Sequence, residues 1–162
     1  MDAKALKGFF TMQPRLDYTK LAPGARQAML GLEKYVRESG LKTSLLELVR
    51  MRASQINHCA FCIDMHSKDA RAAGESEQRL YALNAWRETP FFSDRERAAL
   101  EWTEAVTLVS ETQVPDDVYT RVSEHFSPHE LANLTMAIVA INGWNRIAVS
   151  FRMVPGEYQA KA

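Results

Sequence analysis

The sequence predicts an all-α helical bundle. Apolar residues recur at spacings of three and four along most of the chain, and helix start and stop signals bound these runs. No run alternates strictly between apolar and polar residues between hairpin turns, which argues against strands. The chain has 162 residues, of which 46% are hydrophobic and 25% charged, as in one globular domain with a real core. We therefore expect a single domain over residues 1–162.

Helix start and stop signals position the individual helices. Proline suits a first helical position and glycine a helix end, so one helix is predicted between Pro23 and Gly40. A serine followed three residues later by glutamate predicts helix starts at Ser44, Ser93 and Ser127. The complete set of predicted helices covers residues 23–40, 44–55, 58–74, 76–89, 93–108, 115–122 and 127–151.

Both ends of the chain are predicted to be irregular. Pro155 and Gly156 are expected to close the ordered part of the chain, because proline cannot continue a helix. Residues 1–20 read as a loose arm with four side chains available for packing: Phe9, Phe10, Leu16 and Tyr18.

The bundle could consist of two related halves. The last long helix can be aligned with the cysteine region so that Glu130 falls on Glu47, Asn142 on Cys59, Asn145 on Cys62 and Val149 on His66. In that case only the first half keeps the thiols, and the second is structural. The alternative is that any two long amphipathic helices can be aligned in this way.

Charge and hydropathy narrow the class of partner. Lys plus Arg and Asp plus Glu both number 20, so the formal net charge is zero, which argues against nucleic-acid binding. No apolar run approaches the ~20 residues that cross a bilayer, and the first ten residues lack the apolar region of a signal peptide. These features predict a cytoplasmic protein without a membrane partner.

The main chemical motif holds both cysteines of the chain. Cys59 and Cys62 are spaced C-x-x-C, and His66 follows four residues later. In a helix, steps of three and four residues advance ~300° and ~400°, so the three side chains share one stripe of the surface. In a reducing compartment such a pair is more often catalytic or metal-binding than a structural crosslink.

This stripe could activate a thiol. Cys59 is expected in the first turn of its helix, where the helix dipole favours an anion. His66 could take the proton of Cys62 or stabilise its thiolate. Glu47, on the preceding helix, is the candidate for orienting His66. The alternative for Glu47 is that it merely completes a capping box with Ser44.

Other interpretations of these residues remain open. Two cysteines, a histidine and a glutamate could bind Zn²⁺, although structural zinc ligands usually come as pairs from separate elements. The cysteines could also be simply buried apolar residues. His58 is adjacent to Cys59 and could tune it electrostatically, but a solvent-facing histidine is the commoner outcome. His125 and His129 are expected at the surface or in capping positions.

The pattern of Glu47, Cys59-Ala60-Phe61-Cys62 and His66 resembles the catalytic signature of AhpD-like alkylhydroperoxidases of the carboxymuconolactone decarboxylase superfamily. Residues 141–149 also resemble the second-half helix of small members. The resemblance covers roughly residues 25–155. It implies an all-helical subunit of a homo-oligomer, commonly a trimer or hexamer. By position it makes Cys62 the peroxide-attacking thiolate, Cys59 the resolving cysteine, and Glu47 and His66 the proton relay.

The activity that this resemblance implies is hydroperoxide reduction through a disulfide cycle. No flavin or nicotinamide fingerprint is present, so no cofactor is expected and electrons must come from an external dithiol, either a lipoyl group or a thioredoxin-like protein. Two alternatives are a general thiol-disulfide reductase or redox sensor, and a decarboxylase-type relative that does not depend on the cysteines. A non-enzymatic helical interaction protein is a further alternative.

Overall fold

The computed structural model describes residues 12–160, which form nine α-helices, one 3-10 helix and no strand. The prediction of an all-α fold is therefore confirmed. In chain order the helices are α1 (Tyr18–Leu21), α2 (Pro23–Arg37), α3 (Thr43–Ile56), α4 (Ala60–Ala72), α5 (Glu77–Ala82), η2 (Leu83–Glu88), α6 (Asp94–Thr107), α7 (Val109–Thr112), α8 (Asp116–Ser123) and α9 (Pro128–Phe151).

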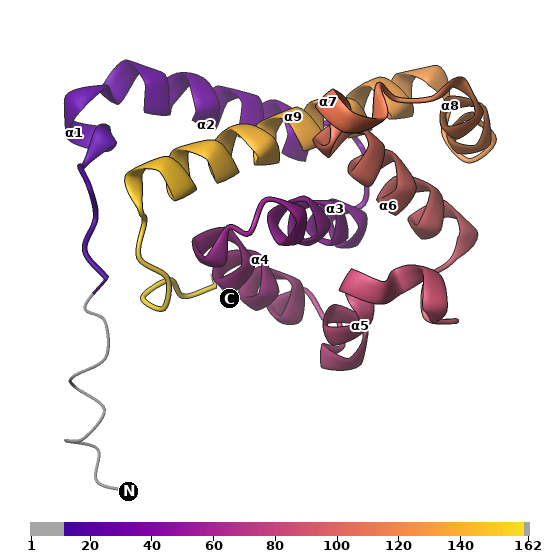
Figure 1. The fold of residues 1–162 in the computed structure, drawn as a ribbon, viewed down its shortest axis with the longest axis horizontal. Helices are drawn as coiled ribbons and strands as arrows, with labels where there is room; N and C mark the ends of the chain where they lie inside the picture. The colour runs from indigo at the N-terminus through magenta and orange to yellow at the C-terminus, as the bar shows by residue number, and fades with distance from the viewer. Residues whose placement is uncertain (1–11, 161–162) are drawn as a thin grey trace, which may run out of the picture.

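Helix α3 lies at the centre of the bundle. It packs against α4, α6 and α9, and α2 packs along α9 on the outside. Figure 1 shows α9 crossing the molecule above α3, with α4 and α5 below it. Most of α3 is consequently buried, including the charged residues Glu47 and Arg50. A buried charge needs a partner, so these two residues point to a polar site inside the bundle.

Three apolar clusters fill the space between the helices. The largest joins α2, α3, α6, α8 and α9 around Leu134 and Ile138, both fully buried. A second joins α3, α4, α5, η2 and α6 around Leu83 and Leu100. The third contains both cysteines and packs them against α9. The cysteine region is therefore part of the core rather than an exposed loop.

Two of the three predicted capping boxes are present. In each of Ser93/Glu96 and Ser127/Glu130 the serine accepts from the third backbone N–H, and the glutamate accepts from the serine N–H. The predicted box at Ser44 is wrong. Helix α3 begins earlier, with Lys42 at its N-cap and Ser44 exposed in its first turn.

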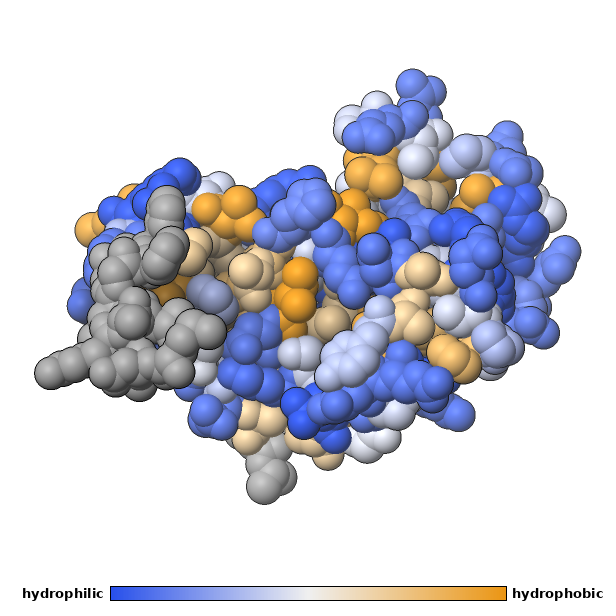
Figure 2. Space-filling view, turned by 60° about the horizontal axis from the view of Figure 1, so that its bottom comes forward, coloured by the Kyte–Doolittle hydropathy of each residue, from blue (hydrophilic) through white to orange (hydrophobic). Residues whose placement is uncertain are grey.

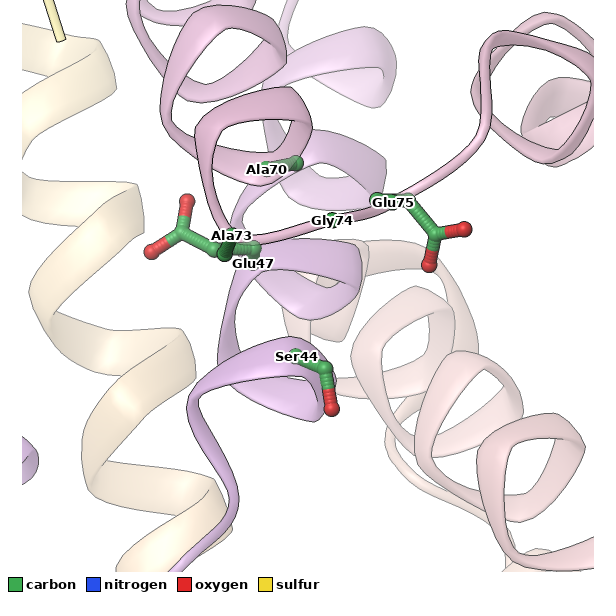
Figure 3. Close-up of a pocket in the computed structure, with 6 residues that line it drawn as sticks. All are labelled: Ser44, Glu47, Ala70, Ala73, Gly74 and Glu75. Carbon is green, nitrogen blue, oxygen red and sulfur yellow. The ribbon is translucent and has the colours of Figure 1, made fainter. Parts of the chain in front are cut away.

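The reason is that the Glu47 carboxylate is bonded elsewhere. It contacts Arg50 and His66 inside the bundle. Figure 3 shows the Ser44 hydroxyl and the Glu47 carboxylate pointing in different directions. The sequence spacing of a capping box is therefore present at this position without its hydrogen bonds.

The remaining boundaries differ from prediction in detail. Helix α4 starts at Ala60 rather than near His58, because the backbone of His58 has a φ of +52° and cannot continue a helix. The helix predicted over 76–89 is divided into α5 and η2, with a non-helical Ala85 inside η2. The short helix α7 was not predicted. The two aligned segments also differ in form, since α9 is continuous where α3 and α4 are separate helices.

Both ends of the described chain contact the bundle. Part of the predicted loose arm forms α1, where Tyr18 stacks on Phe151 with ring centroids 5.8 Å apart. Phe9 and Phe10 lie outside the described residues. The expectation that Pro155 and Gly156 close the ordered chain is wrong, because the segment after α9 turns back and runs along α4 as far as Tyr158.

The surface mixes polar and apolar residues. In Figure 2 hydrophilic residues occupy most of the face shown, and hydrophobic ones lie in separate groups. Across residues 12–160, we find no helix with the length and apolar character that a membrane span requires.

Candidate active site

Both cysteines lie at the start of α4. Cys59 is the N-cap residue, and its Sγ accepts a hydrogen bond from the backbone N–H of Cys62 at 3.4 Å. The two residues are joined as a disulfide, with their Cα atoms 5.4 Å apart, a common separation for such a bond. Each cysteine is only 1% exposed. The sequence thus brings two sulfurs into bonding distance within one helical turn.

Apolar side chains surround the disulfide. Ala53 from α3, Ile141 and Ala148 from α9, and the partly buried Phe61, Trp144 and Met153 pack in the same cluster. This environment excludes water and strengthens any electrostatic interaction inside it.

His66 and Glu47 form a buried pair beside this cluster. Nδ1 of His66, one turn after Cys62 on α4, lies 2.9 Å from Oε2 of Glu47 on α3. Both residues are buried. Burial alone would raise the pKa of Glu47, but the hydrogen bond and charge of His66 and the charge of Arg50 outweigh it and lower that pKa. A proton on Nδ1 donated to this carboxylate leaves Nε2 of His66 as the basic nitrogen.

The polar site continues away from the cysteines. Arg50 Nη1 donates to Oε1 of Glu47 at 2.6 Å, and Arg50 Nη2 donates to Oε2 of Glu33 on α2 at 2.8 Å. Trp144 Nε1, on α9, donates to Oε1 of Glu33 at 3.1 Å. This chain of hydrogen bonds joins four helices, from Trp144 to His66.

The carboxy-terminal segment, residues 153–158, covers α4. Gly156 N–H donates to Asp64 Oδ2 at 3.0 Å, and Lys68 Nζ donates to the Tyr158 carbonyl at 2.9 Å. The Tyr158 hydroxyl donates to Asp69 Oδ1 at 2.6 Å. Burial, this hydrogen bond and the charges of Asp69 and Glu47 raise the pKa of Tyr158 to about 12. A neutral phenol therefore lies next to the Glu47–His66 pair.

The turn between α3 and α4 is attached to α9. Asn57 Nδ2 donates to Oδ1 of Asn142 at 3.0 Å and to Oδ1 of Asn145 at 2.9 Å. Asn145 Nδ2 in turn donates to Ser54 Oγ at 3.0 Å. These bonds fix the residues that immediately precede Cys59. Asn142 and Asn145 thus support the turn from α9.

A small cavity of about 100 Å³ reaches Glu47 from the far end of α4. Figure 3 shows its lining, which comes from the first turns of α3 and the end of α4: Ser44, Glu47, Ala70, Ala73, Gly74 and Glu75. It has room for only a few water molecules. It is too small for a bulky organic substrate.

A larger hollow of about 490 Å³ lies apart from the cysteines, along α6 and α8. Its arginines already have partners. Arg121 pairs with Glu101 and Asp117, and Arg97 donates to backbone carbonyl groups. Satisfied guanidinium groups do not favour a ligand there.

The zinc alternative is not favoured by this geometry. In the described part of the chain, the residues whose donor atoms lie close enough for a metal are Glu47, His66 and Asp69, all within 4.8 Å of one another. This set contains neither cysteine. Its members already take part in hydrogen bonds to Arg50 and Tyr158.

The other histidines lie outside the site. His58 is exposed at the turn before α4, and His129 is exposed in the first turn of α9. His125, before α9, offers its backbone carbonyl to Arg95. None of these imidazoles contacts Glu47 or His66 through a hydrogen bond that the structure shows.

Several site residues were missed from the sequence. Arg50 follows Glu47 by three residues, which is the spacing of a helical ion pair and could have indicated it. Glu33, Asp69, Trp144 and Tyr158 carry no such local signal, because their partners come from distant parts of the chain.

Comparison with known proteins identifies the family. Residues 23–105 match the model of the Carboxymuconolactone decarboxylase family. The uncharacterized protein YdfG of Bacillus subtilis (strain 168) is 45% identical over 139 residues, which are 86% of this chain and 95% of YdfG.

Solved structures share the fold. A protein of unknown function from Agrobacterium tumefaciens, described as a candidate antioxidant defence protein AhpD, superposes with a TM-score of 0.87 at 46% identity, over 90% of this chain and 100% of that one. The debrominase Bmp8 superposes with a TM-score of 0.77 at 18% identity, over 86% of this chain and 75% of Bmp8. The chain is therefore an AhpD-like member of the carboxymuconolactone decarboxylase family.

Proposed function

We propose that the protein is a thiol-dependent peroxidase that reduces hydroperoxides through a Cys59–Cys62 disulfide cycle. The observation that carries this proposal is the position of the pair at the start of α4, one turn before a histidine that is bonded to a buried glutamate. This arrangement supplies a nucleophile, a resolving thiol and a base. The likeness to the Agrobacterium protein agrees with it.

In the first step the Cys62 thiolate attacks the distal oxygen of the hydroperoxide. A sulfur–oxygen bond forms as the O–O bond breaks, so the sulfur is oxidised by two electrons to a sulfenic acid. The leaving alkoxide takes a proton from the imidazolium of His66 and departs as an alcohol, or as water from hydrogen peroxide. Glu47 stabilises that imidazolium before the transfer.

In the second step Cys59 resolves the sulfenic acid. Its sulfur attacks the sulfur of Cys62, the S–O bond breaks, and water leaves with the Cys59 proton. An external dithiol then reduces the disulfide by two thiol-disulfide exchanges and becomes a disulfide itself. A lipoyl group or a thioredoxin-like protein has the required chemistry.

The proposal includes a cellular setting. Regeneration by a dithiol needs a reducing compartment, so we propose that the protein acts in the cytoplasm. We also propose a homo-oligomer of three or six subunits, as the family resemblance implies. Catalysis needs no bound cofactor in this scheme, because the dithiol carries the electrons.

Stoichiometric hydroperoxide treatment tests the proposal. We expect the reduced protein to lose two thiols and 2 Da in mass for each equivalent of cumene hydroperoxide, much faster than free cysteine reacts. Double replacement of Cys59 and Cys62 by serine should remove the reaction. Peroxide turnover that survives this replacement would show that the cysteines are not the reacting groups.

Further assays of the same protein distinguish the proposed peroxidase from the alternative functions. A general disulfide reductase or sensor would reduce a model disulfide faster than it consumes hydroperoxide. A decarboxylase-type enzyme would keep its activity after both thiols are alkylated. Debromination is the activity in the name of Bmp8, and a brominated substrate can be tested beside the hydroperoxide. The 18% identity to Bmp8 shows only a shared fold.

A further inference from the structure

Arg50 occupies an unusual position for a charged side chain. It lies on α3 one turn after Glu47 and is only 5% exposed. Its guanidinium bridges two carboxylates, with Nη1 on Glu47 Oε1 at 2.6 Å and Nη2 on Glu33 Oε2 at 2.8 Å. A buried cation between two anions from different helices has a defined geometry and little freedom to move.

The two oxygens of Glu47 have different partners. Oε1 accepts from Arg50, whereas Oε2 faces Nδ1 of His66. Because the carboxylate is planar, holding one oxygen at Arg50 fixes the direction of the other. The orientation of the glutamate toward the imidazole therefore depends on Arg50.

The charge around Glu47 also depends on Arg50. The titratable groups around it are Arg50 on its own helix, Glu33 beyond Arg50 on α2, His66 and Asp69 on α4, and Tyr158 from the carboxy-terminal segment. Glu75 lines the same small cavity, but its carboxylate points away from Glu47 (Figure 3) and pairs with Arg79. Two of these, Glu33 and Asp69, are carboxyl groups, whose negative charges oppose ionisation of Glu47. Arg50 carries the permanent positive charge in the group.

We propose that Arg50 is a positioning residue of the active site. It holds Glu47 ionised and directed at His66, and Glu33 together with Trp144 holds Arg50 in place. This inference rests on the proposed thiol chemistry, but its test does not need peroxide turnover.

The test measures Cys62 itself. Reduced Cys59→Ser protein is treated with iodoacetamide across pH 5 to 9, and the alkylation rate of Cys62 reports its thiolate. In Arg50→Met, Glu47 should become easier to protonate and His66 should lose its anionic partner. We expect the acid limb of the profile to move up by about one pH unit and the rate at pH 7 to fall about tenfold.

A second variant of Arg50 separates the effect of its charge from the effect of its hydrogen-bond direction. Arg50→Lys keeps the charge but cannot bridge both carboxylates, so it should leave the acid limb in place and lower the plateau rate about threefold. This variant also keeps the proposal testable if Arg50→Met does not fold. A plateau and an acid limb equal to those of the parent in Arg50→Lys would overturn the inference.

Arg52→Met is the matched control. Arg52 lies on the same helix and makes a comparable ion pair, with Nε 2.8 Å from Oε1 of Glu104, but it does not contact the Glu47–His66 pair. Its replacement should lower stability without moving the alkylation profile. A shift as large as that of Arg50→Met would mean that any lost ion pair on α3 has this effect.

Peroxide kinetics on the same proteins distinguish the two proposals. If hydroperoxide does not react but the alkylation profile moves as expected, the proposed function is wrong and the role of Arg50 stands. If hydroperoxide reacts but the profile stays unchanged in Arg50→Met, the role of Arg50 is wrong and the function stands.

Discussion

The hydroxyl of Tyr158 donates to Oδ1 of Asp69 at 2.6 Å, and this bond attaches the carboxy-terminal segment to the helix that carries both cysteines. Met153, at the other end of the segment, packs in the cysteine cluster. Because each cysteine is only 1% exposed, a reductant can reach the disulfide only after some covering part of the protein moves. The segment has no regular secondary structure and is held to α4 by individual hydrogen bonds rather than by a helix, so we expect it to be the part that moves.

We expect Tyr158→Phe to speed reduction of the disulfide by dithiothreitol. Loss of one hydrogen bond to a charged group costs about 1.5 kcal/mol, which corresponds to about a tenfold rise in the open population. Stopped-flow thiol release measures the rate. Tyr81→Phe is the control, since Tyr81 also donates to a carboxylate, Glu77, but lies exposed on α5. Equal rates in Tyr158→Phe and the parent would show that the segment does not limit access.

The two cysteines should respond differently to replacement. In Cys59→Ser, hydroperoxide should leave a sulfenic acid on Cys62, which dimedone traps and mass spectrometry locates. In Cys62→Ser, Cys59 should react no faster than free cysteine. The opposite assignment is a real alternative, because the Sγ of Cys59 accepts the Cys62 N–H and this bond would also stabilise a Cys59 thiolate. A dimedone adduct on Cys59 in Cys62→Ser, formed at the parent rate, would reverse the assignment.

Glu47→Gln should show a pH-dependent loss of stability. The folded protein lowers the pKa of Glu47, so its contribution is present above the unfolded value near 4.5 and is lost as pH falls through the folded value. Breaking a buried ion pair costs about 3 kcal/mol, so we expect this difference in unfolding free energy at pH 7. Urea titrations at pH 7 and pH 4 should show the difference shrinking at the lower pH.

The control for this experiment is Glu124→Gln, which changes an exposed residue after α8. It should alter the unfolding free energy by less than about 0.5 kcal/mol at both pH values. If Glu47→Gln is as mild as this control at pH 7, the ion pairs of Glu47 make no net contribution to stability.

Three serine replacements test the helix caps. Ser93→Ala and Ser127→Ala each remove an N-cap acceptor and should lower the free energy of unfolding by about 1 kcal/mol. Ser44→Ala should have an effect of less than about 0.5 kcal/mol, because Ser44 is exposed and does not cap α3. Thermal and urea unfolding measure all three. An equal cost at Ser44 would contradict the cap at Lys42.

The helices could be predicted from the sequence because their signals are local. The caps at Ser93 and Ser127 need only residues three positions apart, and the structure has both. The same rule failed at Ser44, because the carboxylate of Glu47 is bonded to Arg50 and His66 and does not accept from the backbone N–H of Ser44. Local spacing cannot show whether such a carboxylate will cap a helix or form a buried ion pair.

The part of the candidate site that depends on local spacing could be predicted from the sequence, and the part that depends on tertiary contacts could not. Cys59, Cys62 and His66 lie within eight residues, so a shared helix predicts that they lie close together. In the structure Cys62 and His66 are on α4, whereas Cys59 is the extended N-cap residue before it rather than part of its first turn. Their attachment to Glu33, Trp144 and Tyr158 depends on how α2, α9 and the carboxy-terminal segment pack, which no local pattern encodes. The assignment of roles to Cys59 and Cys62 remains a prediction.

The first turn of α4 has a property that follows from its cap. The acceptor at its N-cap is the sulfur of Cys59 rather than an oxygen. In the proposed cycle this atom alternates between a disulfide sulfur and a thiol or thiolate, and a thiolate accepts the Cys62 N–H more strongly. The hydrogen bond at the helix start is then strongest when Cys59 is a thiolate and weaker in the disulfide. The backbone hydrogen bond at the start of α4 would therefore differ between the oxidised and the reduced protein.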